Sequence, residues 1–184
     1  GRTALAGSRI ACGVRDDSGG VREMLRVTVF ALAAALATPA LAATPEEDIA
    51  AVLDQLHAAA AKADGPAYFA LYTPDAVFLG TDVTERWTIP AFRAYAQPYF
   101  DKGKGWTYAA RQRQVTIAPI DCRCVAWFDE VLDSQSYGTA RGTGTLVLTP
   151  QGWRDSQYAQ TFPTPNHVAD EVIARIKAIE AAMK

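Results

Sequence analysis

Val125-Ala-Trp-Phe-Asp-Glu-Val-Leu132 is a run of β-branched and aromatic side chains, which is typical of a β-strand. A polar turn at 133–136 separates it from a second run, Thr139 to Thr149, and a turn at 150–152 leads to a third, Trp153 to Phe162. Short runs of this kind with turn residues between them predict antiparallel strands joined by tight turns. The stretch therefore predicts an antiparallel meander.

Strict alternation divides the side chains of this meander between two faces. One face is mostly apolar, with Glu130 and Gln160 set into it, and we expect it to be concave and covered by helices. Gly142 and Gly144 on that face indicate a bend or a close contact. The apolar face carries Trp106, Tyr108, Ala126, Phe128, Glu130, Leu132, Gly142, Gly144, Leu146, Leu148, Tyr158, Gln160 and Phe162, and the other face carries Arg111, Arg113, Trp127, Asp129, Arg141, Thr143, Thr145, Trp153, Asp155 and Gln157.

Helices are predicted on both sides of the meander in the sequence. A capping residue, Thr44, precedes the first helix, and shorter signals predict a second helix over 67–72 and a third over 89–100. A short strand is expected at 76–79. A last helix is predicted over 166–182, with a buried stripe formed by Val168, Val172, Ile173, Ile176, Ile179 and Met183. This order predicts an α+β fold.

The start of the chain resembles a targeting segment. Residues 24–42 combine a positive charge, an apolar core and an Ala-x-Ala ending, which predicts a signal peptide cut after Ala42, with an N-terminal membrane anchor as the alternative. Residues 1–23 are expected to be a non-native leader or a misplaced start, and 43–184 the mature domain. We therefore expect a periplasmic or secreted protein with no stable membrane anchor after cleavage.

Composition excludes some partners and cofactors. The 184-residue chain has a formal net charge of −2 and no basic run, so nothing indicates nucleic-acid binding. Cys122 and Cys124 form a C-x-C pair without the spacing of a zinc site. They could bridge in an oxidising compartment, although we favour two free thiols because the loop would be very small. No metal and no cofactor is expected.

A set of short motifs carries a family resemblance. They are Leu71-Tyr-x-Pro-Asp-Ala-Val-Phe-Leu-Gly-Thr-Asp82, Glu85-Arg-Trp87, Phe100-x-Lys-Gly-Lys-Gly-Trp-Thr-Tyr108, Ala126-Trp-Phe-Asp-Glu130, Arg141-Gly-Thr-Gly144, Gly152-Trp153, Gln157-Tyr158 and Pro165-Asn166. Together they resemble the SnoaL-like branch of the nuclear transport factor 2-like superfamily, over Glu46 to Ile173. The resemblance implies a cone, in which a curved antiparallel sheet wraps round a pocket closed by the first three helices.

The resemblance leaves the activity open. The superfamily includes delta-5-3-ketosteroid isomerase, scytalone dehydratase and polyketide cyclases, while many members only bind ligands or partners, and many form dimers. By position, the isomerase's general base corresponds to Gly80, and its protonated acid to Gly142 and Gly144, so both carboxyls are missing here. The dehydratase relies on pocket histidines, whereas this domain has only His57 and His167.

The candidate site combines carboxylates with an aromatic lining. Glu130 is the best candidate catalytic group, because a desolvated carboxyl has a raised pKa, although it could instead pair with a cation. Asp82, with Glu85, lies in the loop at the expected pocket mouth and could act as a second acid or base. The candidate ligand-binding residues are Trp87, Trp106, Tyr108, Phe128, Tyr158, Gln160, Phe162 and His57.

Three functions fit these features. The favoured one is an exported domain that binds a small apolar or aromatic ligand in an aromatic-lined pocket. The alternatives are a small enzyme of the isomerase, dehydratase or cyclase type that uses Glu130 and Asp82 for proton transfer, and an interaction module. We also expect a homodimer formed through the face that carries Trp127 and Trp153, with an ion pair between Asp129 and Arg141.

Overall fold

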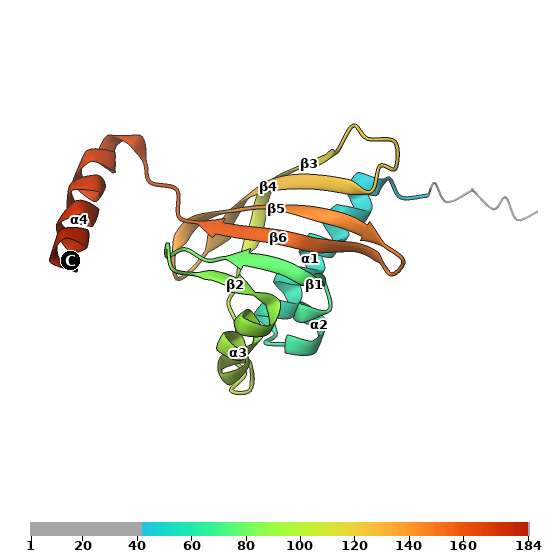
Figure 1. Ribbon diagram of the computed structural model, residues 1–184, viewed down its shortest axis with the longest axis horizontal. Helices are drawn as coiled ribbons and strands as arrows, with labels where there is room; N and C mark the ends of the chain where they lie inside the picture. The colour runs from blue at the N-terminus through green and yellow to red at the C-terminus, as the bar shows by residue number, and fades with distance from the viewer. Residues whose placement is uncertain (1–41, 184) are drawn as a thin grey trace, which may run out of the picture. The chain divides into compact units, whose positions relative to one another are not determined.

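The computed structural model describes residues 42–183 (Figure 1). The predicted leader and nearly all of the predicted signal peptide lie outside these residues. The elements are α1 (Pro45–Ala61), α2 (Gly65–Phe69), β1 (Tyr72–Leu79), β2 (Arg86–Thr88), α3 (Ile89–Phe100), β3 (Ala109–Ile117), β4 (Val125–Ser134), β5 (Gly138–Thr149), β6 (Gly152–Thr161), the 3-10 helix η1 (Asn166–Val168) and α4 (Ala169–Ala182). The fold is therefore α+β, as predicted.

Local capping explains where the first helices begin. The Thr44 side chain accepts from the Glu47 backbone amide, and the Glu47 carboxylate accepts from the Thr44 amide, so a capping box starts α1. The prediction of a second helix over 67–72 is wrong in its bounds. Asp64 caps α2 by accepting from the Ala67 amide, so the helix starts at Gly65 and ends at Phe69.

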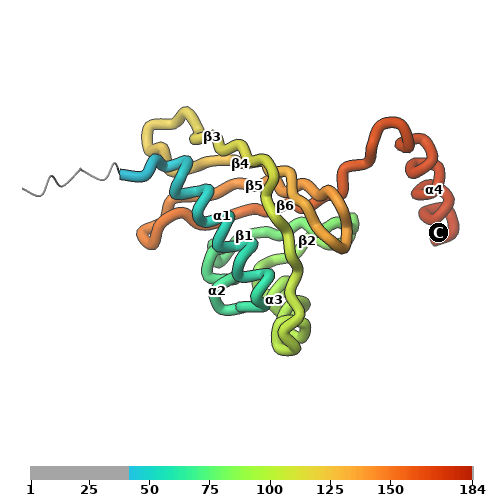
Figure 2. The backbone as a smooth tube through the Cα atoms, turned by 180° about the vertical axis from the view of Figure 1, so that it is seen from behind, coloured from blue at the N-terminus to red at the C-terminus, as the bar shows by residue number. Residues whose placement is uncertain are grey.

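The six strands form one open sheet in the order β2-β1-β6-β5-β4-β3. Neighbouring strands are antiparallel except β1 and β6, which run parallel. The α1 helix packs on β3 and β6, α3 packs on β1, and α2 packs on both helices, so these three helices lie on one face of the sheet (Figure 2). The predicted sheet with its three covering helices is thus confirmed, with β2 added at its edge.

Two register shifts change the predicted faces. On β3 the shift lies between Ala110 and Gln112, and it places Arg113 opposite Glu130, on the helix-covered side. Between β5 and β6, Thr145 pairs with Gln157 but Leu146 pairs with Asp155. Because a bulge reverses which face each following residue occupies, strict alternation assigned this part of the sheet wrongly.

Three residues predicted on the outer face are therefore on the inner one. Arg113 has only 12% of its side chain exposed, while Trp153 is 5% and Asp155 0% exposed. In contrast, Leu148 and Phe162, predicted on the covered face, are about half exposed.

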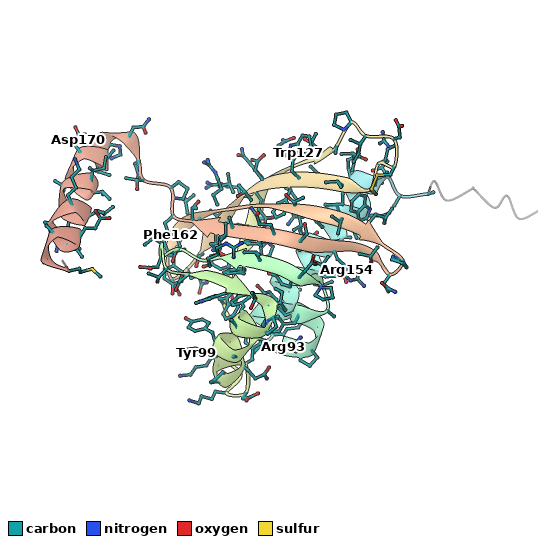
Figure 3. All side chains as sticks on the ribbon, viewed as in Figure 1. Arg93, Tyr99, Trp127, Arg154, Phe162 and Asp170 are labelled. Atoms are coloured by element: carbon teal, nitrogen blue, oxygen red, sulfur yellow. A yellow bond between two sulfur atoms is a disulfide. The ribbon has the colours of Figure 1, made fainter. Side chains whose placement is uncertain are left out.

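The predicted dimerisation face is not formed as expected. Trp127 is 47% exposed and lies on the side of the sheet away from α3 (Figure 3), but Trp153 is buried. Asp129 lies opposite Thr143, and Arg141 lies opposite Val131, so the predicted cross-strand pair of these two charges is wrong. The two tryptophans do not share one exposed apolar face.

The close contact predicted at the paired glycines is present. A Cβ atom added at Gly144 would overlap the backbone carbonyl of Gln157 and lie 2.6 Å from the Phe128 ring, so the sheet and an aromatic side chain leave no space there. We expect Gly144→Ala to lower the free energy of unfolding by about 1–3 kcal/mol, because neither neighbour can move freely. Urea unfolding measures this, with the exposed Gly138→Ala, whose φ of 71° penalises any side chain, as the comparison for backbone strain alone.

The last helix differs from its prediction in burial. A 3-10 turn precedes α4, and the apolar stripe of α4 is exposed: Ile173 is 47%, Ile176 49%, Ile179 56% and Met183 81% exposed. Helical spacing predicts which face is apolar but does not show whether another element covers it. None of the described helices is long and apolar enough to cross a membrane.

The two cysteines before β4 are joined. Cys122 and Cys124 form a disulfide across a turn in which Arg123 has a φ of 46°. The favoured prediction of free thiols is therefore wrong. The left-handed conformation of Arg123 brings the chain round within a single residue, which the spacing alone did not indicate.

Candidate functional site

A hollow of about 170 Å³ opens between β1, β2, α3, the segment before β3, the β4–β5 turn and the end of β6. It is smaller than the roughly 300–1,000 Å³ of drug-sized pockets, so its occupant would be small. Its lining is dominated by aromatic rings, with few polar groups. The lining residues are Phe78, Gly80, Thr81, Glu85, Trp87, Phe92, Tyr95, Trp106, Tyr108, Tyr137, Gln160 and Phe162.

The rings that line this hollow, which we name the aromatic hollow, come from two sides. On one side, Trp87 packs against Tyr95 at a centroid distance of 4.6 Å and against Phe92 at 5.3 Å. On the other side, Tyr137 in the β4–β5 turn stacks on Phe162 at 5.0 Å. Tyr95, Tyr137 and Phe162 are all more than 40% exposed, so the mouth is rimmed by accessible rings. Large apolar side chains held at a surface hollow are typical of a binding site.

Gln160 is the buried polar side chain of the hollow. It lies on β6, is only 7% exposed, and its amide nitrogen donates no hydrogen bond to a described residue. Tyr108, which also lines the hollow, has a pKa that is raised by burial and by nearby Tyr137, while a contact with the Gln160 side chain, without full hydrogen-bond geometry, lowers it in part. A buried donor without a partner is energetically unfavourable unless a bound molecule accepts from it.

Glu85 is the carboxylate of the lining. It ends the turn 80–85, in which the Gly80 amide donates to the Glu85 carbonyl at 2.8 Å and the Asp82 amide donates to the Glu85 carboxylate at 3.2 Å. A Cβ atom at Gly80 would overlap that carboxylate. The absence of a side chain at Gly80 therefore lets Glu85 fold back against the end of β1.

Asp82 has a structural role in the same turn. Its carboxylate accepts from the Thr84 amide at 2.8 Å and from the Thr84 hydroxyl at 2.6 Å, and these bonds lower the pKa of Asp82. The side chain is exposed and does not line the hollow. The structure thus does not bring Asp82 together with Glu130.

Glu130 is completely paired inside the core, 1% exposed. One carboxylate oxygen lies 2.7 Å from His57 Nε2 and accepts from the Tyr158 hydroxyl at 3.0 Å, and the other accepts from Arg113 Nε at 2.9 Å. Arg113 Nη2 is also 2.8 Å from that second oxygen, as an ion pair without hydrogen-bond geometry. Arg113 Nη1 continues the network to the exposed Asp54 carboxylate at 2.8 Å.

This pairing reverses the predicted shift of the Glu130 pKa. Burial acts to raise this pKa, but the hydrogen bond and charge of His57 and the charge of Arg113 outweigh it, so the pKa lies below its ordinary value. The predicted raised pKa is therefore wrong, and Glu130 is an ionised group at neutral pH. Sequence alternation missed the cause because it placed Arg113 on the opposite face.

The predicted ligand-binding residues fall into two groups. One group lines the aromatic hollow: Trp87, Trp106, Tyr108, Gln160 and Phe162. The other lies in the core or in the Glu130 network: Phe128, Tyr158 and His57. Within the described residues, no group of three or more His, Cys, Asp or Glu side chains could hold a metal ion.

Sequence reasoning missed several side chains here. Phe92 and Tyr95 lie on α3, whose sequence predicts only a helix, and Tyr137 lies in a turn where no pattern indicates a ring's direction. Asp155 was placed outside, but it is buried with neither carboxyl oxygen hydrogen-bonded to a described residue. Only the register shift beside Asp155 explains its position, and no local sequence signal predicts that shift.

A second hollow lies away from the aromatic one, between α1 and the β5–β6 turn. It measures about 740 Å³ and is lined in part by Trp153, Leu148 and Arg123. Its lining includes no buried unpartnered polar side chain, so it lacks the feature that distinguishes the aromatic hollow.

Known proteins resemble this chain in sequence and in fold. The sequence matches the SnoaL-like domain over residues 49–165. No curated protein matches it. Similar solved structures include an NTF2-like protein of unknown function from Pseudomonas putida, with 16% identity and a TM-score of 0.55 over 66% of this chain and 88% of that one. A protein of unknown function from Pectobacterium atrosepticum has 20% identity and a TM-score of 0.55 over 67% and 94%.

A domain with a cystatin-like fold from Nostoc punctiforme is also similar, with 15% identity and a TM-score of 0.53 over 77% of this chain and 98% of that one. At these identities the likeness shows the fold, while the family match covers most of the described residues. The chain therefore belongs to the SnoaL-like family, within the nuclear transport factor 2-like superfamily.

Proposed function

We propose that this protein binds a small ligand in the aromatic hollow and holds it by a hydrogen bond from Gln160. The single observation that carries the proposal is the buried Gln160 amide nitrogen, which lines a hollow made of aromatic rings and has no partner of full hydrogen-bond geometry, only a loose contact with Tyr108. Rings supply apolar contact to any flat molecule, and one placed donor selects a ligand that carries an acceptor.

Proton-transfer catalysis by Glu130 and Asp82 has less support. Neither carboxylate lines the hollow, and both already accept hydrogen bonds from other side chains. A general acid or base must reach the proton that it transfers, which these two groups do not. We therefore keep ligand binding as the conclusion.

We further propose that the mature domain is exported and forms a homodimer. The signal-like segment at 24–42 supports export to the periplasm or the medium. The exposed apolar stripe of α4, with Ile173, Ile176 and Ile179, supports self-association, because a second copy would remove these side chains from water.

Replacing Gln160 tests the binding proposal. We expect Gln160→Leu to weaken binding of 4-hydroxyacetophenone, a flat ring with a carbonyl acceptor, by up to about tenfold, because one hydrogen bond is lost. Isothermal titration measures the affinity. The matched control is Gln157→Leu, the same change at an exposed position of β6, which should bind as wild type does. Equal losses in both variants, or none in Gln160→Leu, would contradict the proposal.

A further inference from the structure

The lining of the aromatic hollow carries charge of only one sign. Its twelve lining residues include eight aromatic side chains and one carboxylate, Glu85, but no lysine, arginine or histidine. The nearest basic residue in sequence, Arg86, is exposed on β2 and alternates with Trp87, so its side chain points to the other face. Arg93 on α3 is engaged elsewhere, with its guanidinium 4.5 Å from the centroid of Phe69.

The position of the Glu85 charge is fixed by the fold. Backbone amides of the turn hold the residue, and Gly80 leaves room for its carboxylate. The Glu85 charge also acts on Tyr95 at the rim of the hollow. The pKa of Tyr95 is raised by burial, by Tyr99 and then by Glu85. Glu85 thus sets a negative potential among rings whose faces are themselves negative.

We propose that the ligand of this hollow is a small organic cation, a quaternary ammonium or protonated amine that also carries a hydrogen-bond acceptor. This inference rests on the proposed function, because it names the chemical class that the same site takes. Ring faces attract a cation through their quadrupoles, and a carboxylate beside them strengthens that attraction. An anionic ligand would meet Glu85 without any lining cation to offset the repulsion.

Different residues bind the hydrogen-bond acceptor and the positive group of the proposed ligand. The Gln160 nitrogen donates to an oxygen of the ligand, while Glu85 and the rings hold its positive end. The modest volume of about 170 Å³ limits the ligand to a compact molecule. Choline has this combination, a trimethylammonium group and a hydroxyl oxygen on a short chain, and serves as the probe.

The test compares choline with its neutral carbon isostere, 3,3-dimethylbutan-1-ol, by isothermal titration at low ionic strength. We expect wild type to bind choline about tenfold more tightly than the isostere. Glu85→Gln keeps the size and the contact with the Asp82 amide but removes the charge, so the preference should fall to about threefold or less. Asp129→Asn, which removes an exposed charge of β4 that does not line the hollow, should keep the preference.

Several results would overturn the inference. They are equal affinities of wild type for the two probes, no binding of choline, and an unchanged preference in Glu85→Gln. If Glu85→Gln does not fold, as judged by circular dichroism, two wild-type measurements decide. They are the preference for choline over the isostere and the weakening of choline binding at higher salt. If 4-hydroxyacetophenone binds through Gln160 but choline is not preferred over its isostere, the ligand is not a cation and the proposed function still stands.

Discussion

Replacing Arg113 with methionine should lower the free energy of unfolding by about 3–5 kcal/mol, since it leaves the ionised Glu130 buried without its arginine partner. The arginine makes both an ion pair and a hydrogen bond with Glu130, and it also donates to the Ala50 carbonyl at 3.0 Å. Urea unfolding followed by circular dichroism at neutral pH measures the loss.

Two further variants isolate the cause. Arg111→Met changes an exposed arginine of the same strand, whose contact with Asp133 is 3.3 Å and half exposed, so we expect a change of at most about 1 kcal/mol. Adding Glu130→Leu to Arg113→Met should recover part of the stability, because the uncompensated charge disappears. If the double variant loses as much stability as Arg113→Met and Glu130→Leu lose together when measured singly, packing and not charge explains the effect.

The Glu130 network also predicts a pH dependence. Because the folded-state pKa of Glu130 lies below its unfolded value, the network's contribution is fully present above the unfolded pKa. It is lost as the pH falls through the folded pKa. Wild type should therefore lose stability in acid more steeply than Arg113→Met, in which this shift is reduced.

Replacing Asp155 with asparagine should raise the free energy of unfolding at neutral pH, the opposite of the effect expected for Arg113→Met. Burial raises the pKa of Asp155 well above its ordinary value, and the charge of Glu130 adds to this. The backbone amide of Gln157 lowers it in part, without the geometry of a hydrogen bond. The fully buried carboxyl must therefore bind a proton to stay in the core.

The sign of the pH effect follows from this raised pKa. The folded state binds a proton that the unfolded chain releases, so the stability due to the protonated acid is present below the unfolded pKa and is lost as the pH rises towards the folded pKa. The advantage of Asp155→Asn over wild type should thus grow by about 1.4 kcal/mol per pH unit in that interval.

Unfolding curves at several pH values check this expectation. The control is Asp129→Asn, at an exposed position of β4, whose difference from wild type should change little with pH. An Asp155→Asn difference that is constant between acid and neutral pH would mean that this carboxyl is not protonated in the folded protein.

The main elements could be predicted because their signals are local. The Thr44 cap, the helix ending at Phe100 and the strand run around Trp127 each depend on neighbouring residues, and all three are present. The family resemblance, which rests on motifs spread through the chain, gave the pocketed cone as well.

The candidate site could be predicted only in part, because its geometry depends on register. Two shifts moved Arg113 and Asp155 to the inner face, and Arg113 is one of the two groups that keep the pKa of Glu130 low. The exposed stripe of α4 was missed for a different reason: periodicity describes one helix, while burial requires a second surface. Tyr137 shows a third limit, since a turn residue's direction follows from tertiary packing.

The central claim, that the aromatic hollow is the binding site, has one direct test in the four tryptophans of the chain. Trp87 and Trp106 line this hollow, Trp127 is exposed on the outer face, and Trp153 lines the second hollow. We would titrate ¹⁵N-labelled protein with 4-hydroxyacetophenone and follow the indole N–H signals. The account predicts saturable shifts of Trp87 and Trp106 with the other two unchanged, and it is contradicted if only Trp127 or Trp153 moves, or if none does.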